Sequence, residues 1–440
     1  MIKSQIKTPL CLIEYGDRIL LQNRVMENIF KPFVEGKVNR RTDKTMNKEK
    51  TRENGIKQEP ENDCAFSLLE TGRNAFPEII SQIRSARQEI IIHMFLWRED
   101  RIGVEIAGEL LKAANRGVSI VIEKDRYGLL LEYCEESQRS FCHSPDLWER
   151  IQIKVLCLAC NRDLYRKRLQ VMRSELYRKL KEHPNVIMVD NRKTKDHSKY
   201  YIFDRRIMIL GGINIEDKEY FCDSKGRIYY DYMVKISDSK IVSQFLDKRR
   251  FPQKKNDLFR VNAKEPVRCF ELKKSYLELI DNTECELIIV MAYFAPEKEI
   301  LAAIYRALER GVSVRILIPR NANYMHDSNM LTVLKLLGKK HVCSNGKENG
   351  KMSVFLTDYM LHAKLMMNEK RIITGSCNIT EKAFRKLGEL CITVDNNDSP
   401  FACQVRASVE EIFRSSAHVD DCGEIRFDHC MAALERVIMR

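Results

Sequence analysis

The chain has 440 residues, of which 44% are hydrophobic and 31% charged, and these proportions exclude a disordered or fibrous protein. Its formal net charge of +13 favours polyanionic partners, namely anionic membrane surfaces, nucleic acid or phosphorylated substrates, and does not choose among them. No run of about eighteen apolar residues occurs, so no transmembrane helix is expected.

Two segments of different character open the chain. Residues 1–34 are predicted to form an N-terminal extension with a short strand pair that turns at Gly16 and Asp17. Residues 35–61 are nearly all polar or charged, with both signs mixed, which is typical of a flexible linker.

The remainder contains an internal repeat, with a first half at 62–250 and a second half at 251–440. Each half carries a buried strand, an amphipathic helix and a second strand, and the tetrapeptide RGVS stands between helix and second strand at 116–119 and at 310–313. The helices are marked by apolar side chains at helical spacing: Ile102, Ile106, Leu110, Ala114, Ile300, Ile304 and Leu308. The strand–helix–strand order predicts parallel strand pairing and an α/β fold.

The first half has a basic insertion at 161–183. Its apolar residues form a helical stripe, with arginine and lysine on the other faces: Tyr165, Leu169, Met172, Leu176 and Leu180. An amphipathic surface helix packed on the domain is the favoured interpretation. A basic helix that docks on anionic lipid headgroups is the alternative.

Each half then reaches a block with chemically versatile side chains. The first block reads HSKYYIFDRRIMILGGIN and contains His197, Lys199, Asp204, Gly212 and Asn214. Because alternate residues of a strand share a face, His197 and Lys199 are predicted to point the same way. The strands YYIF and IMIL are predicted to form a hairpin, after which small residues let the backbone approach a ligand.

The second block repeats this pattern. It contains His362, Lys364, Glu369, Ser376 and Asn378 in LHAKLMMNEKRIITGSCN. A His-x-Lys pair alone is weak evidence, but its recurrence behind a matching strand–helix–strand unit indicates a duplicated functional site.

These residue types suit phosphodiester chemistry. Two lysine ammonium groups and two asparagine amides can neutralise phosphate oxygens without a metal ion or cofactor. One imidazole can attack phosphorus and form a covalent phospho-histidine. The other can protonate the leaving alkoxide and later activate an alcohol or water.

The two blocks resemble the phospholipase D superfamily, whose mark is a twice-occurring His-x-Lys-x4-Asp followed by Gly-x-x-Asn. The resemblance covers roughly 62–415 and is strongest to the cardiolipin synthase branch, in DHSKYYIFDRRIMILGGINIED and in AYFAPEKEILAAIYRALERGVSVRILIPRNAN. It implies two α/β sandwich halves related by a pseudo-twofold axis, with one active site at their seam.

The resemblance also implies roles for individual residues. His197 is expected to be the nucleophile and His362 the general acid and base, while carboxylates at Asp231 and Glu389 orient the histidines. Asp204 and its counterpart Glu369 belong to the catalytic motif, where they are expected to brace it.

Two departures from the family pattern stand out. Glu369 occupies a position where aspartate is expected, and Asn378 follows His362 by one residue fewer than Asn214 follows His197. Many cardiolipin synthases also carry N-terminal membrane helices, and none is expected here.

The resemblance implies a phosphatidyltransferase that passes a phosphatidyl group through phospho-histidine to an alcohol such as phosphatidylglycerol. The alternative is a hydrolase of the same fold that acts on phospholipid or nucleic-acid diesters. The expected partners are a phospholipid and an anionic membrane surface, with nucleic acid under the alternative. We expect a cytoplasmic chain that can bind peripherally to the inner face of the membrane. The oligomeric state stays open.

Overall fold

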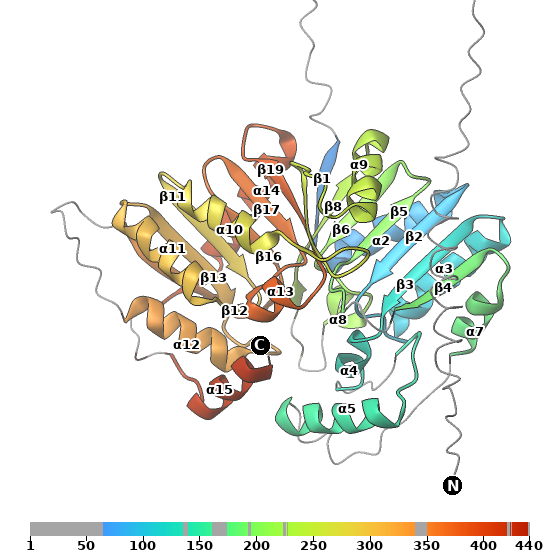
Figure 1. The fold of residues 1–440 in the computed structure, drawn as a ribbon, viewed down its shortest axis with the longest axis horizontal. Coiled ribbons are helices and arrows are strands. Elements are labelled where there is room, and N and C mark those ends of the chain that lie inside the picture. Colours follow the sequence, from blue (N-terminus) through green and yellow to red (C-terminus); the bar gives the residue numbers. More distant parts are fainter. Residues whose placement is uncertain are drawn as a thin grey trace, which may run out of the picture. The chain divides into compact units, whose positions relative to one another are not determined.

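The repeated strand–helix–strand units form the centres of two sheets in a computed structural model of the protein (Figure 1). The structure describes residues 65–134, 140–160, 174–191, 195–222, 226, 228–338, 350–419, 423 and 425–438. The expected N-terminal strand pair at 1–34 and linker at 35–61 lie outside these ranges.

The first half builds a seven-stranded sheet in the order β1-β8-β6-β5-β2-β3-β4. Its elements are β1 (Phe66–Glu70), α2 (Thr71–Ser85), β2 (Glu89–Met94), α3 (Arg101–Asn115), β3 (Ser119–Asp125), α4 (Gly128–Glu132), α5 (Leu147–Cys160), α7 (Glu175–Glu182), β4 (Val186–Asn191), β5 (Tyr200–Phe203), β6 (Ile207–Gly211), α8 (Asp217–Tyr220), β7 (Tyr229–Tyr230), β8 (Tyr232–Ile236) and α9 (Ser239–Arg250).

The second half builds a nine-stranded sheet in the order β10-β9-β19-β17-β16-β11-β13-β14-β20. Its elements are β9 (Phe259–Ala263), β10 (Cys269–Phe270), α10 (Leu272–Asp281), β11 (Glu286–Met291), β12 (Phe294–Ala295), α11 (Lys298–Glu309), β13 (Ser313–Pro319), α12 (His326–Leu337), β14 (Met352–Thr357), β15 (Met360–Leu361), β16 (Lys364–Met367), β17 (Arg371–Gly375), β18 (Ile379–Thr380), α13 (Glu381–Arg385), β19 (Glu389–Asp395), α14 (Pro400–Arg414), β20 (Ala417–His418) and α15 (His429–Ile438).

Six strands of each sheet follow the same order. The run β8-β6-β5-β2-β3-β4 matches β19-β17-β16-β11-β13-β14 strand for strand. As predicted, β2 pairs in parallel with β3, and β11 with β13. The glycines after α3 and α11, Gly117 and Gly311, both have φ of +91°, the left-handed conformation that ends a helix.

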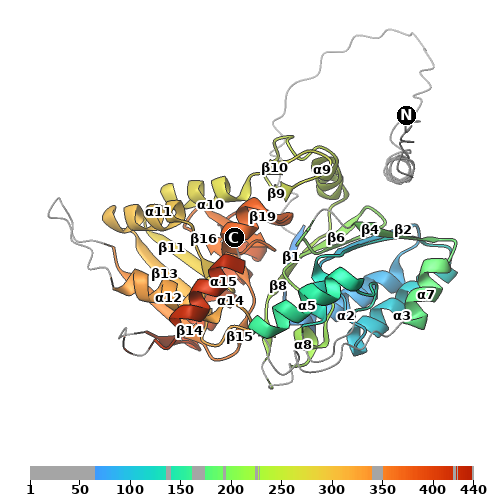
Figure 2. The ribbon, with the colours of Figure 1, turned by 60° about the horizontal axis from the view of Figure 1, so that its bottom comes forward.

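Each sheet has its own apolar core. Helices α2 and α3 pack Phe76, Ile79 and Ile106 against β2 and β3, and helices α10 and α11 cover the second sheet in the same way. The halves lie side by side in both views (Figures 1 and 2), and a parallel pair, β7 with β15, joins them. The predicted α/β class with two related halves is confirmed.

The basic insertion differs from the predicted single helix. Ser174 is extended and its side chain accepts a hydrogen bond from the Tyr177 amide, so it caps the N-terminus of α7 and interrupts any helix running through it. Leu180 of α7 is buried in the first core, as expected for a packed surface helix. Residues 161–173, which include Tyr165, Leu169 and Met172, lie outside the described ranges.

No helix in the described ranges is both long enough and apolar enough to span a bilayer.

Candidate active site

Both histidines lie where a strand of one half meets a segment of the other. His197 precedes β5, and its backbone amide donates to the Gly388 carbonyl at 2.7 Å. His362 precedes β16, and its amide donates to the Tyr230 carbonyl, also at 2.7 Å. Gly388 and Tyr230 stand directly before Glu389 and Asp231, so each histidine is tied by its backbone to the carboxylate segment of the opposite half.

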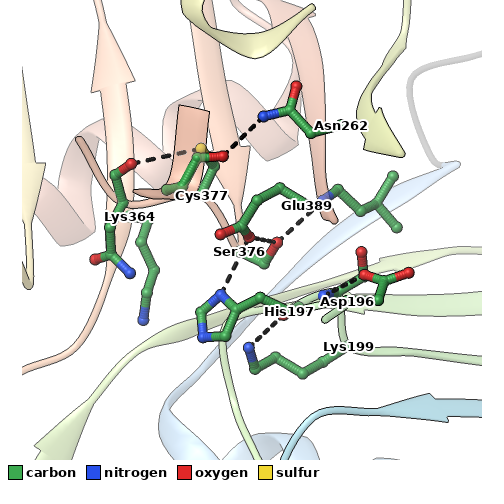
Figure 3. Close-up of polar contacts among 12 residues, drawn as sticks. Asp196, His197, Lys199, Asn262, Lys364, Ser376, Cys377 and Glu389 are labelled. Atoms are coloured by element: carbon green, nitrogen blue, oxygen red, sulfur yellow. Dashed lines mark hydrogen bonds and ion pairs between the residues drawn. The ribbon is translucent and has the colours of Figure 1, made fainter. Parts of the chain in front are cut away.

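The side chains also make contacts between each histidine and the opposite half. His197 Nδ1 lies 3.1 Å from Glu389 Oε2, and His362 Nδ1 lies 2.8 Å from Asp231 Oδ2 (the first pair is drawn in Figure 3). The strand register gives the two carboxylates equivalent places, because Met233 pairs with Gly211 just as Cys391 pairs with Gly375. Each half therefore supplies a histidine to one pair and a carboxylate to the other.

The two motif lysines are fully buried beside the histidines. Lys364 Nζ lies 3.1 Å from Asp231 Oδ2 and also donates to the His362 carbonyl. Lys199 Nζ donates to the carbonyl of His197 (Figure 3). The repeated His-x-Lys spacing thus places two ammonium groups next to two imidazoles. Unlike the prediction, His197, Lys199 and His362 lie just before β5 and β16 and not on these strands.

Burial and the lysine charges keep both imidazoles neutral. Burial, reinforced by Lys364, lowers the pKa of His362 to about 3. The pKa of His197 falls well below its ordinary value for the same reasons, with Lys199 adding the larger charge effect. Burial also lowers the pKa of Lys199 to about 7, with Lys364 contributing to the decrease.

The two carboxylates differ in charge state. Burial disfavours the ionised form of Asp231, but the charge of Lys364 and the hydrogen bond from His362 outweigh it and lower its pKa. Burial raises the pKa of Glu389 to about 8. Ser376 Oγ donates to Glu389 Oε2, whereas the buried Oε1 has no hydrogen-bond partner among the described residues (Figure 3).

The small residues after each hairpin give room to these carboxylates. A Cβ at Gly212 would lie 2.2 Å from Asp231 Oδ2, so a larger residue there would displace the carboxylate. Ser376 holds the equivalent place in the second half and contacts Glu389 instead. The expected close approach at Gly212 is thus an approach to a side chain of the protein.

The two asparagines also occupy equivalent places. Asn214 Oδ1 accepts from the Leu96 amide, and Asn378 Oδ1 accepts from the Tyr293 amide, both at 3.2 Å. These bonds fix both amide groups at the ends of β2 and β11, with Nδ2 as the donor end of each.

Asp204 and Glu369 are not brought together with the histidines. The Asp204 carboxylate accepts from three consecutive amides, the closest being Gln88 at 2.8 Å, and Glu369 accepts from the Glu284 amide at 2.9 Å. Both carboxylates therefore lie at the hairpin turns, where they hold the start of the neighbouring strand.

Several neighbours of the histidines were not predicted from the sequence. The Phe95 ring lies 4.6 Å from the His197 ring, and Tyr293 lies 6.0 Å from His362. Glu219 Oε1 is 3.7 Å from His362 Nδ1, and burial raises the pKa of this carboxyl to about 8. Phe95 is the first residue after β2 and Tyr293 the second after β11, and a position just after the repeated buried strand is the signal that could have identified them.

Within the described ranges, no group of three or more histidine, cysteine or acidic side chains could hold a metal ion.

The fold has a solved counterpart. Phosphatidylserine synthase from Haemophilus influenzae Rd KW20 matches with a TM-score of 0.61 at 14% identity, covering 85% of this chain and 95% of that one. This similarity, which concerns the fold, and the duplicated histidine–lysine strands define a chain of the phospholipase D-like class. The model of the cardiolipin synthase PLD-like domain matches residues 79–250 and 276–415, and the chain belongs to that family.

Curated relatives agree with this assignment. Cardiolipin synthase B from Salmonella typhi is 27% identical over 278 residues, covering 58% of this chain and 59% of that protein. Cardiolipin synthase B from Escherichia coli (strain K12) is 26% identical over the same shares. Cardiolipin synthase A from Buchnera aphidicola subsp. Schizaphis graminum is 22% identical over 381 residues, covering 81% and 70%. The chain thus spans 59% of the length of the first two relatives.

Proposed function

We propose that the protein is a phosphatidyltransferase of the cardiolipin synthase type that works through a phospho-histidine intermediate. The observation that carries the proposal is the exchanged pair of histidine–carboxylate contacts beside two buried lysines. The cardiolipin synthase domain family and the names of its curated relatives support phosphatidyl transfer over other phosphodiester reactions.

In the first step, His197 Nε2 attacks the phosphorus of a phosphatidyl donor. We assign the Nδ1 proton of His197 to its contact with Glu389, which leaves the lone pair on Nε2. A nitrogen–phosphorus bond forms while the bond from phosphorus to the alcohol oxygen breaks. The low pKa of His197 keeps this imidazole unprotonated and ready to attack at neutral pH.

His362 supplies the proton to the leaving alkoxide. In the free protein its pKa is about 3, because burial and Lys364 disfavour the charged imidazolium. A bound phosphodiester anion adds negative charge beside both lysines and raises that pKa. Ionised Asp231 then stabilises the imidazolium through its Nδ1 contact. In the second step the neutral imidazole removes a proton from the acceptor alcohol, whose oxygen displaces His197.

The lysines and asparagines stabilise the negative charge that develops on the phosphate oxygens. Lys199, Lys364 and the Nδ2 groups of Asn214 and Asn378 are the donors that we assign to the phosphate oxygens, with Gly212 and Ser376 shaping the site around the carboxylates. These donors carry the neutralising charge themselves, so the proposed reaction has no metal or cofactor step. Asp204 and Glu369 act as braces for the two hairpins.

The test is to incubate the protein with phosphatidylglycerol vesicles and to separate the lipid products. Cardiolipin and free glycerol are the expected products. Phosphatidic acid alone would show that water resolves the intermediate and would identify a hydrolase. Cleavage of nucleic acid without lipid turnover would replace the proposal with a nuclease.

A further inference from the structure

Helix α5 presents an apolar face to solvent. Leu147, Trp148 and Val155 are 79%, 66% and 63% exposed, and Ile151 between them is also exposed. At 100° per residue these four side chains lie on one side of the helix. The opposite side carries Ile153 and Cys157, which are buried against Leu129 and Tyr133. The exposed apolar face is therefore distinct from the one that attaches α5 to the protein.

Helix α15 in the second half shows the same division. Val437 is 67% exposed and Leu434 is exposed one turn before it, whereas Ala432 is buried against α12. Eleven large apolar side chains are exposed in the described part of the chain, and six of them lie on α5 and α15. We call these six the α5–α15 surface: Leu147, Trp148, Ile151, Val155, Leu434 and Val437.

Both helices lie at the sheet edge that holds the histidines. Strand β5 runs antiparallel to β2, so His197 lies at the carboxyl end of β2, and His362 likewise lies at the carboxyl end of β11. Helices α4 and α5 follow the carboxyl end of β3, and α12, which supports α15, follows that of β13. Figure 1 shows α5 and α15 together at the lower edge, and Figure 2 shows both in front.

A short series of contacts links α5 to the site. Glu149 of α5 accepts from Arg126 at 2.6 Å. The adjacent Tyr127 packs on Phe95 with ring centres 6.4 Å apart, and Phe95 lies against His197. The orientation of α5 is therefore set by the same loop that borders the nucleophile.

We propose that the α5–α15 surface docks on a phospholipid bilayer and holds the histidine edge of the protein against the headgroup layer. This inference rests on the proposed function, because the acyl chains of a phosphatidyl donor stay in the bilayer while its phosphorus must reach His197. A tryptophan among aliphatic side chains is suited to the membrane–water boundary. Arg150 and Lys154 border the apolar face of α5, and basic side chains there complement anionic headgroups.

The tryptophans of this chain provide a direct test. There are two, and Trp97 is fully buried, so Trp148 is the one that changes environment on docking. With phosphatidylcholine–phosphatidylglycerol vesicles, the emission is expected to shift to shorter wavelength. Phosphatidylcholine brominated on its acyl chains is expected to quench it. Sedimentation with vesicles without shift or quenching would overturn the proposal, and so would a failure to bind vesicles.

A pair of variants distinguishes binding through this surface from nonspecific binding to vesicles. Ile151→Gln with Val155→Gln removes apolar area without adding charge and is expected to weaken vesicle binding about tenfold or more. Val104→Gln on α3, also an exposed valine on a helix, is the matched control and is expected to bind normally. Turnover of lipid in vesicles is expected to fall with binding in the double variant.

Turnover of bis(p-nitrophenyl) phosphate, a water-soluble diester, is expected to stay unchanged in the double variant, because the site itself is intact. If the wild-type protein turns over neither lipid nor soluble diester but still shows the Trp148 shift, the proposed function is wrong and the docking proposal is retained. If the double variant instead converts a dimer to a monomer in sedimentation and binds vesicles normally, the surface is a contact between two copies of the chain and the docking proposal is wrong.

Discussion

At the scale of single residues, the contact between Lys364 and Asp231 combines two buried charges with a histidine. Removing one partner of such a pair leaves the other charge buried without compensation, which costs about 3–5 kcal/mol. We predict that Lys364→Met lowers the free energy of unfolding by about 3 kcal/mol, measured by urea denaturation. Adding Asp231→Asn is expected to restore much of the stability and none of the activity.

Lys370→Met is the matched control for this variant. Lys370 also pairs with an acidic residue, Glu284, but both side chains are more than half exposed. Exposed ion pairs contribute little, so this variant is expected to unfold like the wild type. Equal losses in both lysine variants would contradict the buried-pair account.

Lys199 gives the site a measurable pH dependence. Its pKa is lowered to about 7, so its charged form is lost as pH rises through that value, and kcat/KM is expected to fall on the alkaline side. A bound phosphodiester anion favours the charged lysine, so the fall in kcat is expected at higher pH than the fall in kcat/KM. In Lys199→Arg the guanidinium stays charged, and the alkaline fall in the residual activity should disappear. An unchanged pH profile in Lys199→Arg would show that the alkaline fall in activity comes from another group.

The sequence predicted most of the residues that meet at the site, because their spacing repeats. His197, Lys199, His362 and Lys364 follow from the repeated His-x-Lys spacing at the start of each hairpin, and the asparagines follow from the hairpins that return to it. The exchange of carboxylates was not predictable, since Asp231 and Glu389 look like companions of the histidine in their own half. Only the packing of one half on the other brings each to the opposite histidine.

At the scale of elements, the hairpin turn explains both irregularities of the second block, the glutamate at position 369 and the spacing that is shorter by one residue. Tyr200 pairs with Leu210, and Leu365, at the equivalent place after the motif lysine, pairs with Thr374. Both hairpins therefore have the same register near the site. The second hairpin is one residue shorter than the first, and the difference lies in its turn, far from the histidines. There the longer side chain of Glu369 reaches the amides that begin β11, as Asp204 does for β2.

A bracing role for Glu369 predicts a loss of stability without a loss of chemistry. Glu369→Ala removes a hydrogen bond from a backbone amide to a charged group, and we expect a decrease of about 1 kcal/mol in the free energy of unfolding. The rate per folded molecule is expected to stay within about twofold of the wild type. A large fall in that rate at full folding would place Glu369 in the reaction.

Elements with local signals were predicted well, and those that depend on tertiary contacts were not. The apolar spacing of α3 and α11 and the glycines after them indicated both repeats correctly. The interruption of the 161–183 segment at Ser174 was missed, because the apolar stripe continues through it, although serine is a residue type that favours the N-cap position. The order of strands in the sheets likewise follows from packing between segments distant in sequence.

At the scale of the whole molecule, the exchanged contacts make the two halves interdependent. Neither half contains a histidine together with the carboxylate that contacts it, although both halves carry the same six-stranded arrangement. The proposed reaction therefore requires both halves of one chain, with a different task for each histidine.

The division of labour between the histidines tests the central claim most directly. A donor with a p-nitrophenolate leaving group needs no proton, so His362→Ala is expected to attack it and then stall with the phosphoryl group attached. Mass spectrometry of the digested protein is expected to find the adduct on His197, and His197→Ala should form none. An adduct on His362 in the His197→Ala variant, or no covalent adduct in either, would contradict the account.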